Sequence, residues 1–165
     1  MELLRPEEVT QIASEYPEHD PTGRDLLVAK TVHRFSITRQ DFDRLIWQEI
    51  DATRFLTPRD QPRTMADIRS RLAADGRSFQ QLAEGLRIPG EYDPEWFKGC
   101  VRIIEQQLQL PKGRLVLVRA TPAERDQSPN TRYYIRDGVH RALVVASEDP
   151  EPWPRVEALL IHPRP

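Results

Sequence analysis

The chain has 165 residues, of which 38% are hydrophobic and 30% are charged, and this length and composition are those of one globular domain. The 24 basic residues are balanced by 26 acidic ones, which gives a net charge of −2. That balance excludes a protein that holds duplex DNA by bulk positive charge, but it allows a local basic pocket. No apolar run approaches the roughly 20 residues that span a bilayer, and the acidic start does not fit a secretory signal. We therefore expect no membrane partner and a cytoplasmic location, which the single cysteine fits.

The first part of the chain predicts two helices separated by a strand. Residues 6–16 have a leading proline, an acidic first turn and apolar residues at helical spacing, which predicts an amphipathic helix. We interpret residues 18–24 as a loop. The alternation within residues 26–37 is typical of a strand. Thr38, with an acidic residue three positions later, predicts the start of a second helix.

A block of helices is expected between residues 64 and 109. Thr64 and Ser78 each begin a capping-box pattern, and Gly76 is well placed to end the first of these helices. A longer helix follows, with apolar residues at helical spacing and Cys100 on its apolar face. Such a cysteine is better interpreted as a buried small hydrophobic residue than as a reactive thiol. We expect the whole block to pack on one side of a sheet.

The last part of the chain supplies the centre of that sheet. Residues 115–118 form a continuous apolar run, the pattern of a strand covered on both faces. Residues 133–136 predict a second strand that runs into a turn at Asp137 and Gly138, after which a helix begins. Residues 156–161 predict the closing strand. Because strands and helices mix without regular alternation, the expected fold class is α+β in a single domain.

The turn Asp137-Gly138-Val139-His140-Arg141 is the most informative segment. A helix that begins directly after a strand leaves its first backbone N–H groups unpaired, and such groups attract anions. Gly138 permits close approach of the backbone, and Arg141 can hold phosphate through two N–H groups. His140 can donate to phosphate or transfer a proton near neutral pH. The same residues also fit an ordinary turn, with Asp137 as a helix cap and Arg141 as a solvated charge.

The strand, this turn and the apolar helix after it resemble the phosphate-binding signature of the ParB/sulfiredoxin superfamily. Upstream, residues 50–56 resemble that family's opening strand, and the segment that ends at Arg63 resembles its Gln-Pro-Arg motif. The resemblance implies a ParB/sulfiredoxin-like domain over residues 49–165, a small sheet with packed helices, interrupted by a helical insertion at residues 78–110. Residues 1–48 would then be an N-terminal helix–strand–helix extension.

The resemblance also implies an enzyme that acts on a phosphate-containing substrate, either a nuclease or a nucleotide hydrolase or phosphotransferase. The residues that would contact phosphate are Gly138, Val139, His140, Arg141 and Arg63. The catalytic candidates are His140, Asp137 and Asp51, and Asp60 is the candidate ligand of a magnesium ion. Magnesium and a nucleotide are the implied cofactors, and the choice between the carboxylates as base or metal ligand stays open.

Two departures from the family pattern keep other functions open. Partition proteins of the superfamily have paired arginines in the turn, whereas this chain has Arg141 alone. Sulfiredoxin has a cysteine immediately before its His-Arg pair, where this chain has Val139, so we do not expect reduction of a sulfinic acid by that route. One alternative is a non-catalytic regulatory module that binds a nucleotide or a nucleic acid. The other is a protein-interaction component of a bacterial defence, toxin or mobile-element system.

Overall fold

The computed structural model describes residues 1–47, 64–89, 93–106, 114–119 and 133–162. Within these residues, five strands form one mixed sheet in the order β1-β2-β5-β3-β4. The strands are β1 (Glu2–Leu3), β2 (Thr31–Ile37), β3 (Arg114–Arg119), β4 (Tyr133–Asp137) and β5 (Val156–His162). β3 and β5 are parallel, and the other neighbours are antiparallel. Because β2 pairs with β5 along its whole length, the first 48 residues and the rest of the chain contribute to the same sheet.

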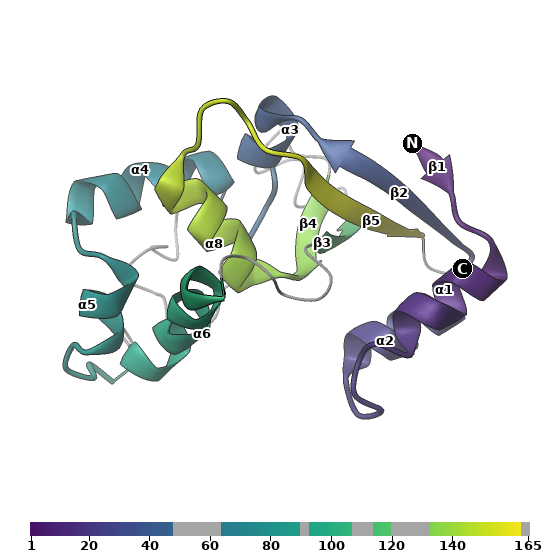
Figure 1. The fold of residues 1–165 in the computed structure, drawn as a ribbon, viewed down its shortest axis with the longest axis horizontal. Helices are drawn as coiled ribbons and strands as arrows, with labels where there is room; N and C mark the ends of the chain where they lie inside the picture. The colour runs from purple at the N-terminus through teal and green to yellow at the C-terminus, as the bar shows by residue number, and fades with distance from the viewer. Residues whose placement is uncertain (48–63, 90–92, 107–113, 120–132, 163–165) are drawn as a thin grey trace.

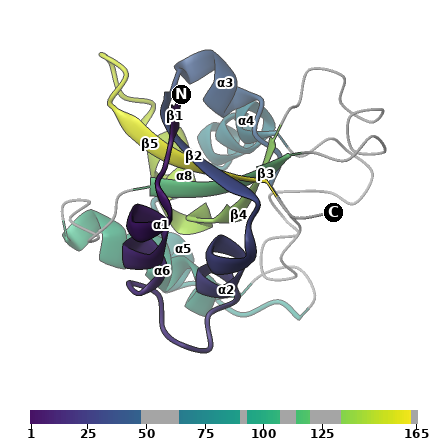
Figure 2. The ribbon, with the colours of Figure 1, turned by 90° about the vertical axis from the view of Figure 1, so that its right-hand side faces the viewer.

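Helices cover both faces of this sheet. The described helices are α1 (Pro6–Ala13), α2 (Pro21–Val28), α3 (Arg39–Asp43), α4 (Met65–Asp75), α5 (Phe79–Ala83), α6 (Pro94–Glu105) and α8 (Val139–Glu148). Figure 1 shows α1 and α2 apart from the group of α4, α5, α6 and α8, and Figure 2 shows α1 and α2 on the near side of the sheet. The architecture is therefore mixed α+β, as the sequence predicts, and the helices expected between residues 64 and 109 do pack on one side.

Two apolar clusters hold these layers together. The smaller one joins α1 and α2 to the sheet and contains Val116, Leu159 and Ile161. The larger one joins the other helices to the opposite face and contains Leu115 and Leu117. Residues of β3 therefore alternate between the two clusters, which confirms that this strand is covered on both faces. Burial of apolar surface on both sides of a strand is the main free-energy contribution that such an arrangement offers.

The local start and stop signals place most helix boundaries correctly. Thr64 and Ser78 form complete capping boxes at the starts of α4 and α5, and Gly76 ends α4 in the left-handed conformation with φ 74°. The predicted loop at residues 18–24 is wrong, because Asp20 accepts a hydrogen bond from the backbone N–H of Thr22 and caps α2. Pro at the first helical position supports that start.

Trp47 and Cys100 lie in the larger cluster, and Trp96 and Trp153 pack against it. Trp47 and Cys100 are fully buried, and burial raises the pKa of the Cys100 thiol to about 12, which confirms its interpretation as a packing residue. Trp153 packs on Phe42, with 5.2 Å between ring centroids, and donates its indole N–H to the Ile37 carbonyl. Within the described part of the chain, no helix has the length and apolar character needed to cross a membrane.

Candidate functional site

The turn between β4 and α8 has the geometry that the sequence predicts. β4 ends at Asp137, next to β3 in the sheet, and Gly138 is the N-cap of α8. Gly138 has φ 91° and, as a glycine, has no side chain with which to cap the helix. A Cβ atom at Gly138 would lie 2.8 Å from Leu115 Cδ2 and 3.1 Å from the Arg114 carbonyl oxygen. Glycine is therefore required here by its left-handed conformation and by close packing on β3.

Two arginines lie near this helix end. Arg141, in the first turn of α8, is only 7% exposed, and Arg114 begins β3 with its side chain 13% exposed. Burial lowers the pKa of Arg141, the positive charge of Arg114 lowers it further, and Asp137 opposes both effects. Burial of two like charges near each other is unfavourable unless negative groups compensate.

Carboxylates hold Arg114 from two directions. Its Nε lies 3.4 Å from Glu157 Oε1 on β5, and its Nη1 lies 3.6 Å from Glu15 Oε2, just beyond α1. The Glu15 atom and the Arg114 atom of this second pair are both buried and lack a hydrogen-bond partner. The second contact is thus an ion pair at a distance longer than a hydrogen bond.

The N-terminal helices also reach Asp137. The hydroxyl of Tyr16 donates a hydrogen bond of 3.3 Å to Asp137 Oδ2, and burial, followed by the charge of Asp137, raises the pKa of Tyr16. Next to it, Arg136 Nε donates to Asp25 Oδ2 on α2 at 2.7 Å. Gly23 lets α2 approach Tyr16, because a Cβ there would lie 3.0 Å from Tyr16 Cβ. The position of the Asp137 carboxylate is therefore set from outside its own strand.

His140 is directed to α6. Its ring lies against Trp96, with 4.2 Å between centroids, and its Nε2 is 3.0 Å from the Trp96 carbonyl oxygen. A carbonyl can only accept, so Nε2 carries the proton and donates it. A Cβ at Gly99 would lie 2.5 Å from the His140 ring, so that glycine makes room for the imidazole. Burial lowers the pKa of His140, which favours the neutral ring.

The structure brings together only part of the predicted site. Asp137, Gly138 and Arg141 lie at one helix end, and Val139 packs partly buried against the larger apolar cluster. Asp51, Asp60 and Arg63 lie outside the described residues, so the proposed second clamp and the magnesium ligand stay predictions. Among the described residues, no group of three or more histidine, cysteine or acidic side chains is arranged to hold a metal ion.

Three residues at this helix end were missed from the sequence. Arg114, Glu15 and Tyr16 reach the turn through the pairing of β3 with β4 and the packing of α1 on the sheet. Their separation from residue 137 along the chain leaves no local pattern. The one available signal was an arginine placed directly before a buried strand, where its side chain lies at the edge of the core.

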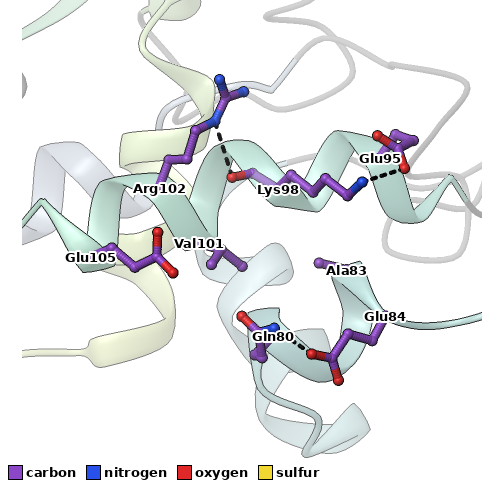
Figure 3. Close-up of a pocket in the computed structure, with 8 residues that line it drawn as sticks. All are labelled: Gln80, Ala83, Glu84, Glu95, Lys98, Val101, Arg102 and Glu105. Carbon is purple, nitrogen blue, oxygen red and sulfur yellow. Dashed lines mark hydrogen bonds and ion pairs between the residues drawn. The ribbon is translucent and has the colours of Figure 1, made fainter.

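A concave region lies between α5 and α6, with a volume of about 550 Å³. Figure 3 shows Ala83 and Val101 directed into it and charged side chains around them. Its cations are engaged locally: Lys98 pairs with Glu95 at 2.5 Å, and Arg102 Nε donates to the Lys98 carbonyl at 3.4 Å. Three glutamates also line the groove, so it is less suited to an anion than the α8 turn.

We compared the chain with protein-family models, with curated proteins and with solved structures, and it matches none of them. The residues of the turn and their surroundings therefore carry the functional argument.

Proposed function

We propose that this protein binds a phosphate-containing ligand at the N-terminus of α8, between Arg114 and Arg141. The observation that carries the proposal is that two cations, the buried Arg141 and the largely buried Arg114, lie near one helix end whose N-cap is a glycine. The first N–H groups of a helix and the positive end of its dipole favour an anion. An anion here would also offset the repulsion between the two guanidinium groups.

Phosphate suits this arrangement better than a single carboxylate. Its oxygens can accept hydrogen bonds from backbone N–H groups and from both guanidinium groups at the same time. Glu15 and Glu157 already orient Arg114, which lowers the entropy lost when it binds a ligand. The resemblance to the ParB/sulfiredoxin superfamily supports a nucleotide or a nucleic acid as the source of the phosphate, and we extend the proposal to that fold and that ligand class.

A second candidate is a phosphoryl-transfer enzyme or nuclease that uses the same site, and Asp137 favours it. Its carboxylate is held by Tyr16 beside Arg141, the arrangement of a base that activates a nucleophile while cations stabilise charge on the phosphoryl oxygens. His140 has its Nε2 hydrogen already donated to Trp96, so we assign proton transfer to Asp137 instead. Asp137 is a chemically suitable oxygen ligand for magnesium, which would help to neutralise the phosphoryl charge.

A thermal-shift panel with a turnover assay separates these candidates. The panel offers nucleoside triphosphates, single- and double-stranded DNA, and RNA, each with magnesium and with a chelator. A binding module should show a raised midpoint with one ligand and no turnover. An enzyme should also show turnover, which Asp137→Asn lowers by roughly 100-fold or more while its ligand-induced shift persists. If no ligand of the panel raises the midpoint and none is turned over, the proposal is contradicted.

A further inference from the structure

An apolar groove lies on the face of the sheet that carries the smaller cluster, where β1 leads into α1 and α2 leads into β2 (Figure 2). It has a volume of about 370 Å³, which is within the range of sites that hold small molecules. Its floor consists of the buried residues Leu4, Leu26 and Val32. Two leucines that line it stay exposed, Leu3 at 58% and Leu27 at 56%. Exposed apolar side chains gathered around one concavity indicate a binding site more strongly than scattered ones do.

One cation and two hydroxyl groups are the polar side chains of this groove. Apart from Thr10, Thr31 and Lys30, the described residues that line it are apolar, and none of them is acidic. Thr10 already donates its hydroxyl proton to the Pro6 carbonyl at 2.9 Å. Lys30 is exposed, and its ammonium group forms no ion pair within the described part of the chain. The groove therefore combines an apolar surface with a single positive charge.

This combination selects the class of ligand. The apolar surface favours a hydrocarbon chain, and the ammonium group of Lys30 favours an anion at one end of that chain. A peptide suits the groove less well, because it would bury amide groups that need hydrogen-bond partners. The strand backbone along the groove is already engaged, since the Leu4 N–H donates to the Val32 carbonyl and Thr31 is paired with β5. A linear carboxylate meets both requirements.

We propose that the groove binds a free medium-chain fatty acid, with the hydrocarbon chain against Leu26, Leu27 and Val32 and the carboxylate paired with Lys30. Burial of the chain supplies most of the affinity, and the ion pair fixes which end of the ligand lies at Lys30. This inference does not depend on the proposed function, because the described residues that line the groove include none of those at the α8 turn.

Isothermal titration calorimetry with octanoate, decanoate and dodecanoate, each below its micelle concentration, tests the proposal. We expect the Kd to fall about tenfold for each pair of added methylene groups until the chain fills the groove, because each buried methylene contributes a similar increment of free energy. Decan-1-ol has a chain of the same length without the charge and should bind about tenfold more weakly than decanoate. Decylammonium, which carries the opposite charge, should bind more weakly still.

Substitutions separate the contribution of the charge from that of the apolar surface. Lys30→Gln should weaken decanoate binding about tenfold and leave decan-1-ol binding unchanged, and its matched control is Lys98→Gln in the groove beside α5. Leu27→Gln should weaken the binding of both ligands. Its matched control is Leu86→Gln, because Leu86 is 87% exposed and does not line this groove. All four side chains are exposed, so each variant should fold, which circular dichroism checks, and neither control should change the Kd of either ligand.

The proposal is overturned if decanoate does not bind, if the Kd does not depend on chain length, or if each variant has the same effect as its control. Loss of decanoate binding in Arg141→Gln would overturn it as well and would place the anion at the α8 turn. A further outcome is a protein that sediments as a dimer, becomes monomeric in Leu27→Gln and binds no decanoate. That result would overturn the proposal and show that this groove is an interface between copies of the chain.

Discussion

His140 and Arg141 are neighbours in the first turn of α8, yet they lie in opposite surroundings. The Arg141 side of the turn is charged and contains Arg114 and Asp137. The His140 side is a packing contact with Trp96 and Gly99 on α6. Adjacent helical residues point about 100° apart, so one turn can serve a ligand with one side chain and the core with the next. A His-Arg pair in a sequence therefore does not establish two ligand contacts.

The largest expected effect on the free energy of unfolding comes from adding a side chain at Gly138, where the turn packs against β3. Gly138→Ala should reduce the free energy of unfolding by about 2–4 kcal/mol, because it combines a left-handed residue with overpacking against Leu115. The matched control is Gly76→Ala, where φ is 74° and nothing lies within 4 Å of the added Cβ. That variant should lose only about 1–2 kcal/mol. Equal losses in urea denaturation would show that packing on β3 is unimportant.

The packing of His140 can be disrupted by a substitution on α6. Gly99→Ala should destabilise the protein by about 1–3 kcal/mol, although alanine is the better helix former, because the new Cβ would lie 2.5 Å from the imidazole. In a His140→Ala background the same substitution should be neutral or stabilising by up to about 1 kcal/mol. A double-mutant cycle measures this reversal of sign. Stabilisation in the wild-type background would contradict the packing role.

The pH dependence of the free energy of unfolding tests the burial of His140. The folded state holds the pKa of His140 below its usual value, so the unfolded chain takes up the proton first as the pH falls. The contribution of His140 is thus fully present above about pH 6.5, the unfolded pKa, and is lost as the pH drops below it. His140→Gln should flatten the decrease in unfolding free energy between pH 7.5 and 5.5. His162, whose pKa is also lowered, should keep some slope. An unchanged slope in His140→Gln would contradict this assignment.

The smallest expected effect on stability concerns an ion pair beside the charged part of the turn. Arg136 and Asp25 form a half-exposed ion pair at 2.7 Å, and such pairs contribute about 0.2–1 kcal/mol. A double-mutant cycle with Arg136→Gln and Asp25→Asn should give a coupling energy in that range, and added salt should reduce it. A coupling of several kcal/mol would mean that the pair does more than hold α2 beside the turn.

Local signals predicted the helix ends well, because caps act within a few residues. The capping boxes at Thr64 and Ser78 are present as expected. The same rule, applied to Asp20, predicts α2. The loop expected at residues 18–24 was wrong because it neglected this cap. The candidate site was predicted only where it is continuous along the chain, at residues 137–141. Arg114 and Tyr16 reach it through tertiary packing, which no spacing in one sequence encodes.

The resemblance to a known family implied roles for residues within the turn, and those roles stay predictions. It implied that His140 and Arg141 both contact phosphate, and the structure places the Nε2 of His140 on a carbonyl of α6. That contact depends on Gly99 and on Trp96, which lie in the segment interpreted as an insertion. A local motif cannot show what a distant helix places against one of its side chains. The proposed phosphate site accordingly consists of Arg114, Arg141 and the N-terminus of α8.

The most direct test is the thermal stability of the protein with inorganic phosphate and pyrophosphate, against sodium chloride at equal ionic strength. The account predicts a saturable rise in midpoint, which at a ligand concentration 100-fold above Kd amounts to about 2.7 kcal/mol, or roughly 5–10 °C. Arg114→Gln and Arg141→Gln should each remain folded and lose most of this rise, while Arg102→Gln, in the groove beside α5, should retain it. A rise no larger than that with sodium chloride, or one that survives in both site variants, would contradict the account.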